Sequence, residues 1–402
     1  MLSRAKKFFF LRDALLFTFT SFGGPQAHMG IMLKDFVKKR AYISEQELLE
    51  LNALTQILPG PSSTQTLIGI AYKVGGVPLA LITFLIWVIP SAAFMCFIAV
   101  SFSRWNTKAL FDHVLTYVQP IAVGIVAYAA YSFARAVLKT PTSVVMAVAA
   151  ILVTLILRNA YVFPILILLG GIISSAIDTP SGENEMKAQL FSNVNRKKLF
   201  YFIGILLVFA TLGALINQTS PFSLPIRLFE NFYRNGIIIF GGGQVLVPLM
   251  YTEFVEMKHY LSAAEFLSGY AFQQAIPGPT FSFTSFVGSM ALKNNGYGLS
   301  GQILGSVVAM LGINLPGLIL VLFIVPFWND LKRITHIKNS LSGINAVAVG
   351  FYFAAFLFLL KTPAINLLTV SLIAGTFLIL YFTKIRTPFL IIAGILLGLL
   401  IK

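Results

Sequence analysis

The sequence predicts an all-α polytopic membrane protein with two homologous, inverted repeats, broken helices and about 10 to 13 membrane segments. Hydrophobic residues make up 57% of the 402 positions and charged residues only 11%, whereas a soluble domain carries roughly a quarter charged residues. Apolar runs long enough to cross a hydrocarbon core of about 30 Å recur along the chain, for example from Leu79 to Val100. These observations make lipid the solvent of this chain.

The second basis of this fold class is an internal repeat with an offset of 218 residues. Phe22, Gly23, Gly24 and Gln26 recur as Phe240, Gly241, Gly242 and Gln244, and Gln56, Pro59, Gly60 and Pro61 recur as Gln274, Pro277, Gly278 and Pro279. Such self-similarity indicates a duplicated unit. We therefore divide the chain into a first repeat (1–178), a linker with one extra membrane span (179–220) and a second repeat (221–402).

The extra span predicts that the second repeat is inverted, because one additional crossing reverses the direction of everything that follows it. The matched loops agree with this interpretation. Residues 34–40 hold four cations, whereas the counterpart, residues 251–258, holds Glu253 and Glu256. Loops of opposite charge favour opposite sides of the membrane.

The net charge of +15 is spread over short basic clusters between the apolar runs. This positive-inside pattern indicates a multi-pass protein of the inner (plasma) membrane in contact with lipid headgroups, and not a nucleic-acid-binding protein. The single cysteine, Cys96, lies in an apolar run, so disulfides and thiolate metal sites are excluded and no cofactor is expected. The oligomeric state is left open, with a homodimer as one option.

Each repeat contains a short capped helix that ends at Pro-Gly-Pro. Ser44 and Glu47, like Ser262 and Glu265, have the spacing of a capping box. About fourteen residues, or about 21 Å of helix, separate the cap from the first proline, which is too short to cross the membrane. Pro-Gly-Pro then breaks the helix, because it lacks two N–H donors and its glycine permits unusual backbone angles.

A broken helix survives in a membrane only where protein or a water-filled cavity surrounds it, so both breaks predict a site. Hydroxyl groups follow each break, at Ser62, Ser63 and Thr64 and at Thr280, Ser282 and Thr284. Beside the free N–H groups of a new helix, these hydroxyls suit an oxyanion. The paired Phe-Gly-Gly motifs, each followed by a glutamine, predict a second broken segment that faces the first, and we expect both breaks to line one cavity.

Several polar residues have no counterpart in the other repeat. We interpret His28 as a packed or interfacial side chain, with a ligand role as the alternative. Glu50, Arg135 and Arg234 lie near the ends of apolar runs, where snorkelling to the interface is the ordinary explanation.

The Phe-Gly-Gly and Gln-x-x-Pro-Gly-Pro motifs in both halves resemble the signature of the chromate ion transporter family. The resemblance implies a long-chain, two-domain member that moves chromate, usually outward and dependent on the proton gradient or membrane potential, with sulfate as a competing oxyanion. The second half departs from the pattern because Gly243 stands where the first half has Pro25.

Two other functions were weighed against this one. A passive anion channel or an oxyanion importer would share the same motifs, since direction and coupling leave no residue signature. An intramembrane hydrolase would need a nucleophile poised beside a base, and Ser62 in Gly-Pro-Ser-Ser has no such partner in the sequence. We therefore predict a transporter without catalytic residues, and chromate and sulfate are not distinguished by the residues.

Overall fold

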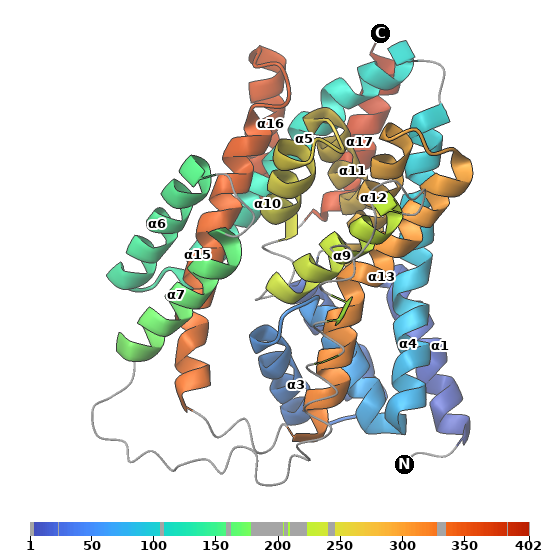
Figure 1. Ribbon diagram of the computed structural model, residues 1–402, viewed down its shortest axis with the longest axis vertical. Coiled ribbons are helices and arrows are strands. Elements are labelled where there is room, and N and C mark those ends of the chain that lie inside the picture. Colours follow the sequence, from blue (N-terminus) through green and yellow to red (C-terminus); the bar gives the residue numbers. More distant parts are fainter. Residues whose placement is uncertain are drawn as a thin grey trace.

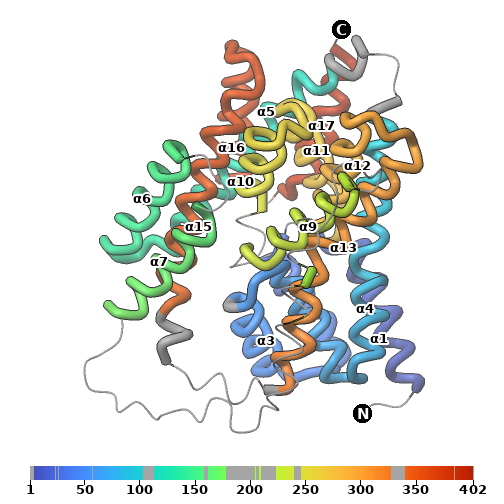
Figure 2. Tube along the Cα trace, viewed as in Figure 1, coloured from blue at the N-terminus to red at the C-terminus, as the bar shows by residue number. Residues whose placement is uncertain are grey.

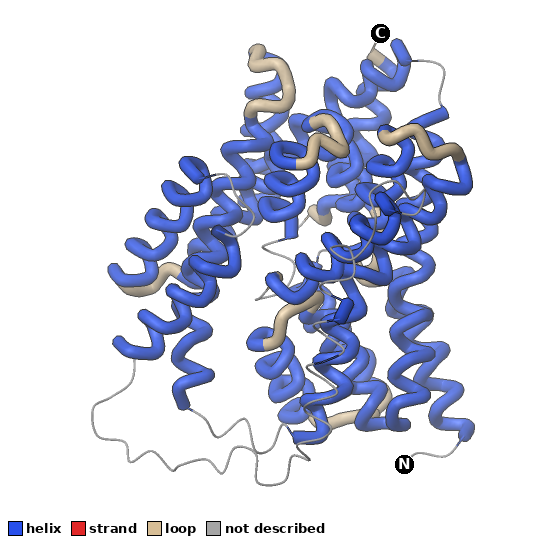
Figure 3. Tube along the Cα trace, viewed as in Figure 1, coloured by secondary structure: helices blue, strands red, loops and turns tan. Residues whose placement is uncertain are grey.

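The computed structural model describes residues 4–22, 24–104, 108–157, 162–177, 204, 208–209, 223–239, 246–327, 335–383 and 385–401. Within these ranges the secondary structure is helical and contains no strand (Figure 3). The predicted all-α fold is therefore confirmed. Most of the expected linker span lies outside the described residues, so the repeat boundaries at 178 and 221 stay a prediction.

The helices of the first repeat follow one another in the order shown in Figure 1. They are α1 (Arg4–Thr20), α2 (Gly24–Met32), the π-helix η1 (Leu33–Lys39), α3 (Glu45–Ile57), α4 (Ser62–Arg104), α5 (Lys108–Val137), α6 (Pro141–Leu157) and α7 (Val162–Ile177).

The second repeat contains the same series. It comprises α9 (Ser223–Ile238), α10 (Leu246–Met250), the π-helix η3 (Tyr251–Met257), α11 (Ala263–Ala275), the 3₁₀ turn η4 (Thr280–Ser282), α12 (Phe283–Asn294), α13 (Leu299–Ile324), the 3₁₀ turn η5 (Val325–Phe327), α15 (Thr335–Leu360), α16 (Leu367–Phe382) and α17 (Thr387–Leu400).

The two repeats agree in detail as well as in order. The π-helices η1 and η3 both have seven residues, and α3 and α11 both have thirteen. Two non-glycine residues with a positive φ angle, Ala41 and His259, are also 218 positions apart. The duplication therefore reproduces irregular backbone as well as regular helices.

Helix α4 consists of two segments joined at Gly76, where φ is 75° and ψ is −168°. The chain reverses there, which brings Trp87 back to the start of the helix, and the Trp87 indole Nε1–H donates to Thr64 Oγ1 over 2.9 Å. The second repeat forms the same hairpin from α12 and α13, with a turn that contains Gly296. The apolar run predicted from Leu79 thus begins just after the reversal.

The repeats are inverted relative to each other. In Figure 1, α3 lies toward the end of the molecule that holds the N-terminus, whereas its counterpart α11 lies toward the opposite end, near the C-terminus. Figure 2 shows that α6 and α7 lie beside α15 of the other repeat, in agreement with the packing of these helices. Packing across the repeats therefore joins the two halves into one body.

The lengths and surfaces of the helices suit a bilayer. Four stretches of the described helices are long and apolar enough to cross a membrane: Ser62–Phe102, His113–Val137, Leu299–Ile324 and Ser340–Leu360. Four shorter apolar helices, α6, α7, α16 and α17, accompany them. These shorter helices expose large apolar side chains such as Ile156, Leu367 and Phe382, which is favourable only where the surrounding solvent is lipid.

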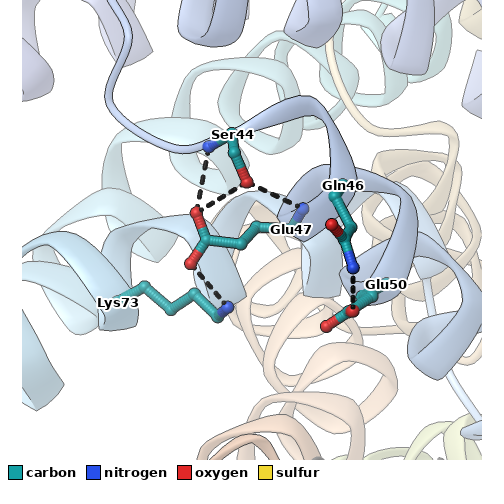
Figure 4. Close-up of polar contacts among 5 residues, drawn as sticks. All are labelled: Ser44, Gln46, Glu47, Glu50 and Lys73. Carbon is teal, nitrogen blue, oxygen red and sulfur yellow. Dashed lines mark hydrogen bonds and ion pairs between the residues drawn. The ribbon is translucent and has the colours of Figure 1, made fainter.

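The short helices α3 and α11 begin at the capping boxes that the sequence predicted. The backbone N–H of Glu47 donates to Ser44 Oγ, and the Glu47 carboxylate accepts from the Ser44 backbone N–H (Figure 4). Ser262 and Glu265 form the same pair of bonds. The Glu47 carboxylate also accepts from Lys73 Nζ over 3.0 Å, which ties α3 to α4.

Candidate functional site

Helices α3 and α11 both end at a Pro-Gly-Pro break. The residues that follow them, Leu58 and Ile276, have extended backbone. The glycines at the centre of the breaks have φ angles of +115° for Gly60 and +106° for Gly278. This left-handed region is open to glycine at little steric cost, so the chain turns at the same place in both repeats.

Each break is hydrogen bonded to the opposite repeat. The backbone N–H of Gly60 donates to the carbonyl oxygen of Ile239 over 2.7 Å, and that of Gly278 donates to the carbonyl oxygen of Ser21 over 2.8 Å. Ser21 and Ile239 are themselves 218 positions apart, and each stands directly before a Phe-Gly-Gly motif. The two motifs found in each half are therefore joined reciprocally, across the boundary between the repeats.

Side chains pair the carbonyl groups that the breaks release. Gln65 Nε2 donates to the Pro59 carbonyl over 2.8 Å and to the Gly317 carbonyl over 3.2 Å. At the second break, Ser91 Oγ of α4 donates to the Pro277 carbonyl over 2.8 Å. Peptide groups that would be costly to expose in lipid are thus paired by protein.

A cavity of about 400 Å³ adjoins the second break. Its described lining comprises Gly24, Pro25, Ala27, Ile125, Tyr128, Ala129, Ser132, Phe133, Val247, Tyr270, Gln274, Thr280, Tyr352 and Thr387. A smaller space shares Gly24, Gln274 and Thr280 with this cavity and is also lined by Gly278 of the break. The first Phe-Gly-Gly motif and the second Pro-Gly-Pro motif therefore meet at one cavity between the repeats.

Three helical segments begin at residues that line this cavity. Helix α2 begins at Gly24, the η4–α12 segment at Thr280, and α17 at Thr387. The start of a helix carries free N–H groups and the equivalent of roughly +0.5 charge. None of the described lining residues has a charged side chain, so the local field of the cavity comes from helix dipoles and neutral polar groups.

The predicted site residues of the second half fall into two groups. Gln274 and Thr280 line the cavity and Gly278 lines the adjoining space. The other two hydroxyls are occupied locally: Ser282 Oγ donates to Gln273 Oε1 over 2.9 Å and to the Pro279 carbonyl, and Thr284 Oγ1 donates to the Phe281 carbonyl. These two residues support the turn that places Thr280.

Among the predicted site residues of the first half, Gly24 lines the cavity, whereas the residues of the first break lie elsewhere. Ser62, Ser63 and Thr64 are buried in the α4 hairpin, with 3%, 6% and 1% exposure. No residue from 56 to 64 belongs to the described lining of the cavity, which differs from the expectation that both breaks line one cavity. The reason is that the hairpin folds back over this segment and uses Thr64 as the acceptor for Trp87.

Part of the predicted site lies outside the described residues. Gly23, Gly241, Gly242, Gln244 and the side chain of Gln26 belong to this group.

The sequence analysis missed five polar residues that line the cavity. They are Tyr128, Ser132, Tyr270, Tyr352 and Thr387. They come from four helices, α5, α11, α15 and α17, and none belongs to a repeated motif. The only available signal was Thr387-Pro388 at the start of an apolar run, which is typical of a helix N-terminus.

Two charged residues behave differently from their interpretation in the sequence. The Arg234 guanidinium does not extend to the interface as an isolated charge. It pairs with Glu230 over 3.0 Å and with Glu253 over 3.2 Å. Glu253 is only 1% exposed and also pairs with Lys258 over 2.9 Å. The negative charge of this loop is therefore neutralised inside the protein, so its sign carries less information about the side of the membrane than the sequence suggested.

His28 is a packed side chain, as the sequence favoured. It is fully buried on α2, and its ring lies 5.4 Å from that of Trp87 and 6.0 Å from that of Phe17. Arg135 is exposed near the end of α5, in keeping with snorkelling.

The fold is that of a multi-pass membrane transporter, because two inverted repeats with paired breaks enclose a cavity between them. The chain belongs to the chromate transporter family, whose model matches residues 9–175 and 226–399. Members of this family are transport proteins, so the chain is a transport protein and not an enzyme.

The curated relatives span most of the chain at low identity. The chain is 24% identical over 395 residues to the chromate transport protein of Cupriavidus metallidurans, covering 97% of this chain and 91% of that protein. It is 25% identical over 332 residues to a probable chromate transport protein of Synechococcus elongatus, covering 82% and 78%. An uncharacterized transporter of Methanocaldococcus jannaschii is 23% identical over 388 residues, covering 95% and 91%. No solved structure matches the chain significantly.

Proposed function

We propose that this protein moves chromate, or the related oxyanion sulfate, outward across the inner membrane, driven by the proton gradient or the membrane potential. The observation that carries the proposal is the convergence of three helix starts on an uncharged, hydroxyl-lined cavity at the repeat boundary. Two curated relatives named as chromate transport proteins support the choice of substrate.

The chemistry of the cavity suits a tetrahedral dianion. Three helix starts supply roughly +1.5 of partial charge in total, against two negative charges on the anion. Thr280 and the Gln274 amide add hydrogen-bond donors, and Thr387 Oγ1 donates to the Gln274 carbonyl over 3.5 Å. Each hydrogen bond to a charged group contributes about 1.5 to 3 kcal/mol. The dianion is thus stabilised without a fixed cation that would hold it too tightly for release.

The position of the cavity suits alternating access. It lies where the first repeat, through Gly24 and Pro25, meets the second repeat, through Gln274 and Thr280. Movement of one repeat against the other would open such a site to one side of the membrane at a time.

The direction and the driving force are tested by reconstitution into liposomes with the pH gradient and the membrane potential imposed separately. Outward movement of labelled chromate or sulfate that depends on either gradient supports the proposal. Movement that only follows the anion concentration indicates a passive channel, and gradient-driven accumulation in the opposite direction indicates an importer.

The position of the site is tested by a matched pair of variants. Thr280→Ala removes a donor from the cavity, so we expect about a ten-fold higher KM for the anion. Ser63→Ala removes a buried hydroxyl of the first break that is not part of the described lining, so we expect an unchanged KM. Initial rates in proteoliposomes, normalised to the amount of protein, measure both. An unchanged KM in Thr280→Ala, or a raised KM in Ser63→Ala alone, would place the anion elsewhere.

A further inference from the structure

Three tyrosines from three different helices line the cavity. Tyr128 lies on α5, Tyr270 on α11 and Tyr352 on α15. Aromatic neighbours fix their rings: Tyr128 packs against Phe377 at 6.1 Å, Tyr270 against Phe283 at 5.9 Å, and Tyr352 against Phe133 at 6.1 Å between ring centroids. Rings that are held in this way lose little side-chain entropy on binding.

The tyrosines break the symmetry of the repeats. At the offset of 218, Tyr270 corresponds to Asn52. Val123-Gly124 of α5 matches Val349-Gly350 of α15 at an offset of 226, and in this register Tyr128 corresponds to Ala354 and Tyr352 to Val126. Ala354 and Val126 are both fully buried. The three phenols therefore gather at the cavity beside the second break, while the positions that correspond to them in the other repeat carry two buried apolar side chains and an asparagine.

Resting on the proposed function, we propose that Tyr128, Tyr270 and Tyr352 bind the transported oxyanion and determine its specificity, so that the second break, and not the first, is the substrate site. A phenol donates a hydrogen bond without a formal charge. The Tyr270 hydroxyl also contacts the Gln274 side chain, which joins this group to the Gln-x-x-Pro-Gly-Pro motif.

Neutral donors select an anion by the strength with which its oxygens accept hydrogen bonds. Sulfate and chromate are doubly charged and accept strongly, whereas perchlorate has a similar tetrahedral shape, a single charge and weakly accepting oxygens. A site that is built to donate hydrogen bonds rejects a ligand that cannot accept them, because its buried donors are then left unpaired. We expect the wild-type protein to bind sulfate in preference to perchlorate, and the tyrosines to be the source of much of that preference.

The test is the binding of sulfate and perchlorate to the purified full-length protein in detergent, measured by titration calorimetry. Tyr128→Phe, Tyr270→Phe and Tyr352→Phe each keep the ring and remove one donor. We expect each to weaken sulfate binding about ten-fold and to reduce the preference for sulfate over perchlorate, with an unchanged melting temperature.

Two matched controls separate binding from structure. Tyr131→Phe removes a hydroxyl from the same helix as Tyr128, at a ring that packs against Phe377 and Tyr381 outside the described lining of the cavity, and it should leave the affinity for sulfate unchanged. Gln274→Ala should weaken sulfate binding, whereas Gln56→Ala, at the equivalent position of the first break, should not.

The outcomes are distinguishable. Any one of three results overturns this inference. The first is wild-type affinity for sulfate in all three tyrosine variants, and the second is an equal loss of affinity in the Gln56 and Gln274 variants. The third is the absence of sulfate binding by the wild-type protein. Weakened binding in the tyrosine variants, with no gradient-driven transport by the wild-type protein, supports the inference and defeats only the proposed direction and coupling.

Discussion

The glycine at the centre of each break is required for its backbone and for its contact with the other repeat. A β-carbon built on Gly278 would lie 2.0 Å from Ser91 Oγ, and one built on Gly60 would lie 3.0 Å from Gln65 Nε2 and 3.1 Å from Gly317 Cα. Ser91 and Gln65 are the residues whose side chains donate to the Pro277 and Pro59 carbonyl groups. Gly317 belongs to α13 of the other repeat. Conformation and close packing thus impose the same residue at both positions.

We expect Gly278→Ala to destabilise the protein by about 1 to 3 kcal/mol, because alanine is strained at this φ angle and its β-carbon meets Ser91 Oγ. Addition of Ser91→Ala should restore part of the loss, since it removes the clashing oxygen but not the backbone strain. Thermal unfolding in detergent, followed by size-exclusion chromatography, measures these changes.

Gly375→Ala in α16, where a β-carbon has open space, is the control for the Gly278 variant and should be neutral or slightly stabilising. Failure of Ser91→Ala to recover any stability would contradict the close approach of Gly278 to α4.

At the scale of elements, the short helices α3 and α11 depend on their first turns. Each has thirteen residues and ends at a break, so it has little length over which to recover the cost of starting a helix. The capping boxes reduce this cost by pairing free N–H groups. In α3 the bond from Lys73 to Glu47 adds a contact with the helix that follows the break.

We expect Ser44→Ala to cost about 1 kcal/mol of stability, and Glu47→Gln to remove part of the pH dependence of unfolding. The backbone N–H of Ser44, followed by the hydrogen bond from Lys73, lowers the pKa of Glu47 below its ordinary value of 4.5. Because the folded state prefers the ionised carboxylate, this stabilisation is complete above about pH 4.5 and is lost as the pH falls through the lower folded pKa. Glu47 is partly exposed, so the effect is moderate.

The measurement is the melting temperature between pH 3 and pH 7, a range chosen to span the ordinary carboxyl pKa of about 4. Glu47→Gln should flatten the acid limb, whereas Glu45→Gln, at an exposed carboxylate on the same turn, should not. Identical acid limbs in the wild-type protein and Glu47→Gln would show that the capping carboxylate does not contribute.

At the scale of the whole molecule, the repeats are joined where each is interrupted. The Gly60–Ile239 and Gly278–Ser21 hydrogen bonds cross the boundary in both directions. Helix α4 also contacts both α12 and α13, and α15 packs against α6 and α7. A change that opens the cavity must therefore either keep these bonds as pivots or exchange them.

The inversion predicts that equivalent loop positions face opposite sides of the membrane. Lys39 and Met257 are 218 residues apart and are both exposed at the ends of the π-helices. In a Cys96→Ser background, we expect Lys39→Cys and Met257→Cys to react with a membrane-impermeant thiol reagent from opposite sides. Intact cells and inverted vesicles provide the two sides. Labelling of both cysteines from the same side would contradict the inversion.

The sequence by itself determined the features that are encoded locally or by repetition. The composition required lipid as solvent, the offset of 218 revealed the duplication, and Ser44 and Ser262 marked the capped helices. Pro-Gly-Pro located both breaks, because proline and glycine limit the backbone whatever surrounds them. These features depend on short-range sterics and hydrogen bonding, which can be read from neighbouring residues.

Only the tertiary structure decided which break adjoins the described cavity and what lines that cavity. The two breaks have the same motif, but the α4 hairpin buries Ser62 to Thr64, whereas Thr280 faces the cavity beside Gly24. Tyr128, Tyr270, Tyr352 and Thr387 come together from separate helices. Their proximity results from the packing of helices that are distant in sequence and from the inversion of one repeat against the other. No spacing along the chain records such packing, because it is fixed by contacts between surfaces and not by the backbone of any one segment.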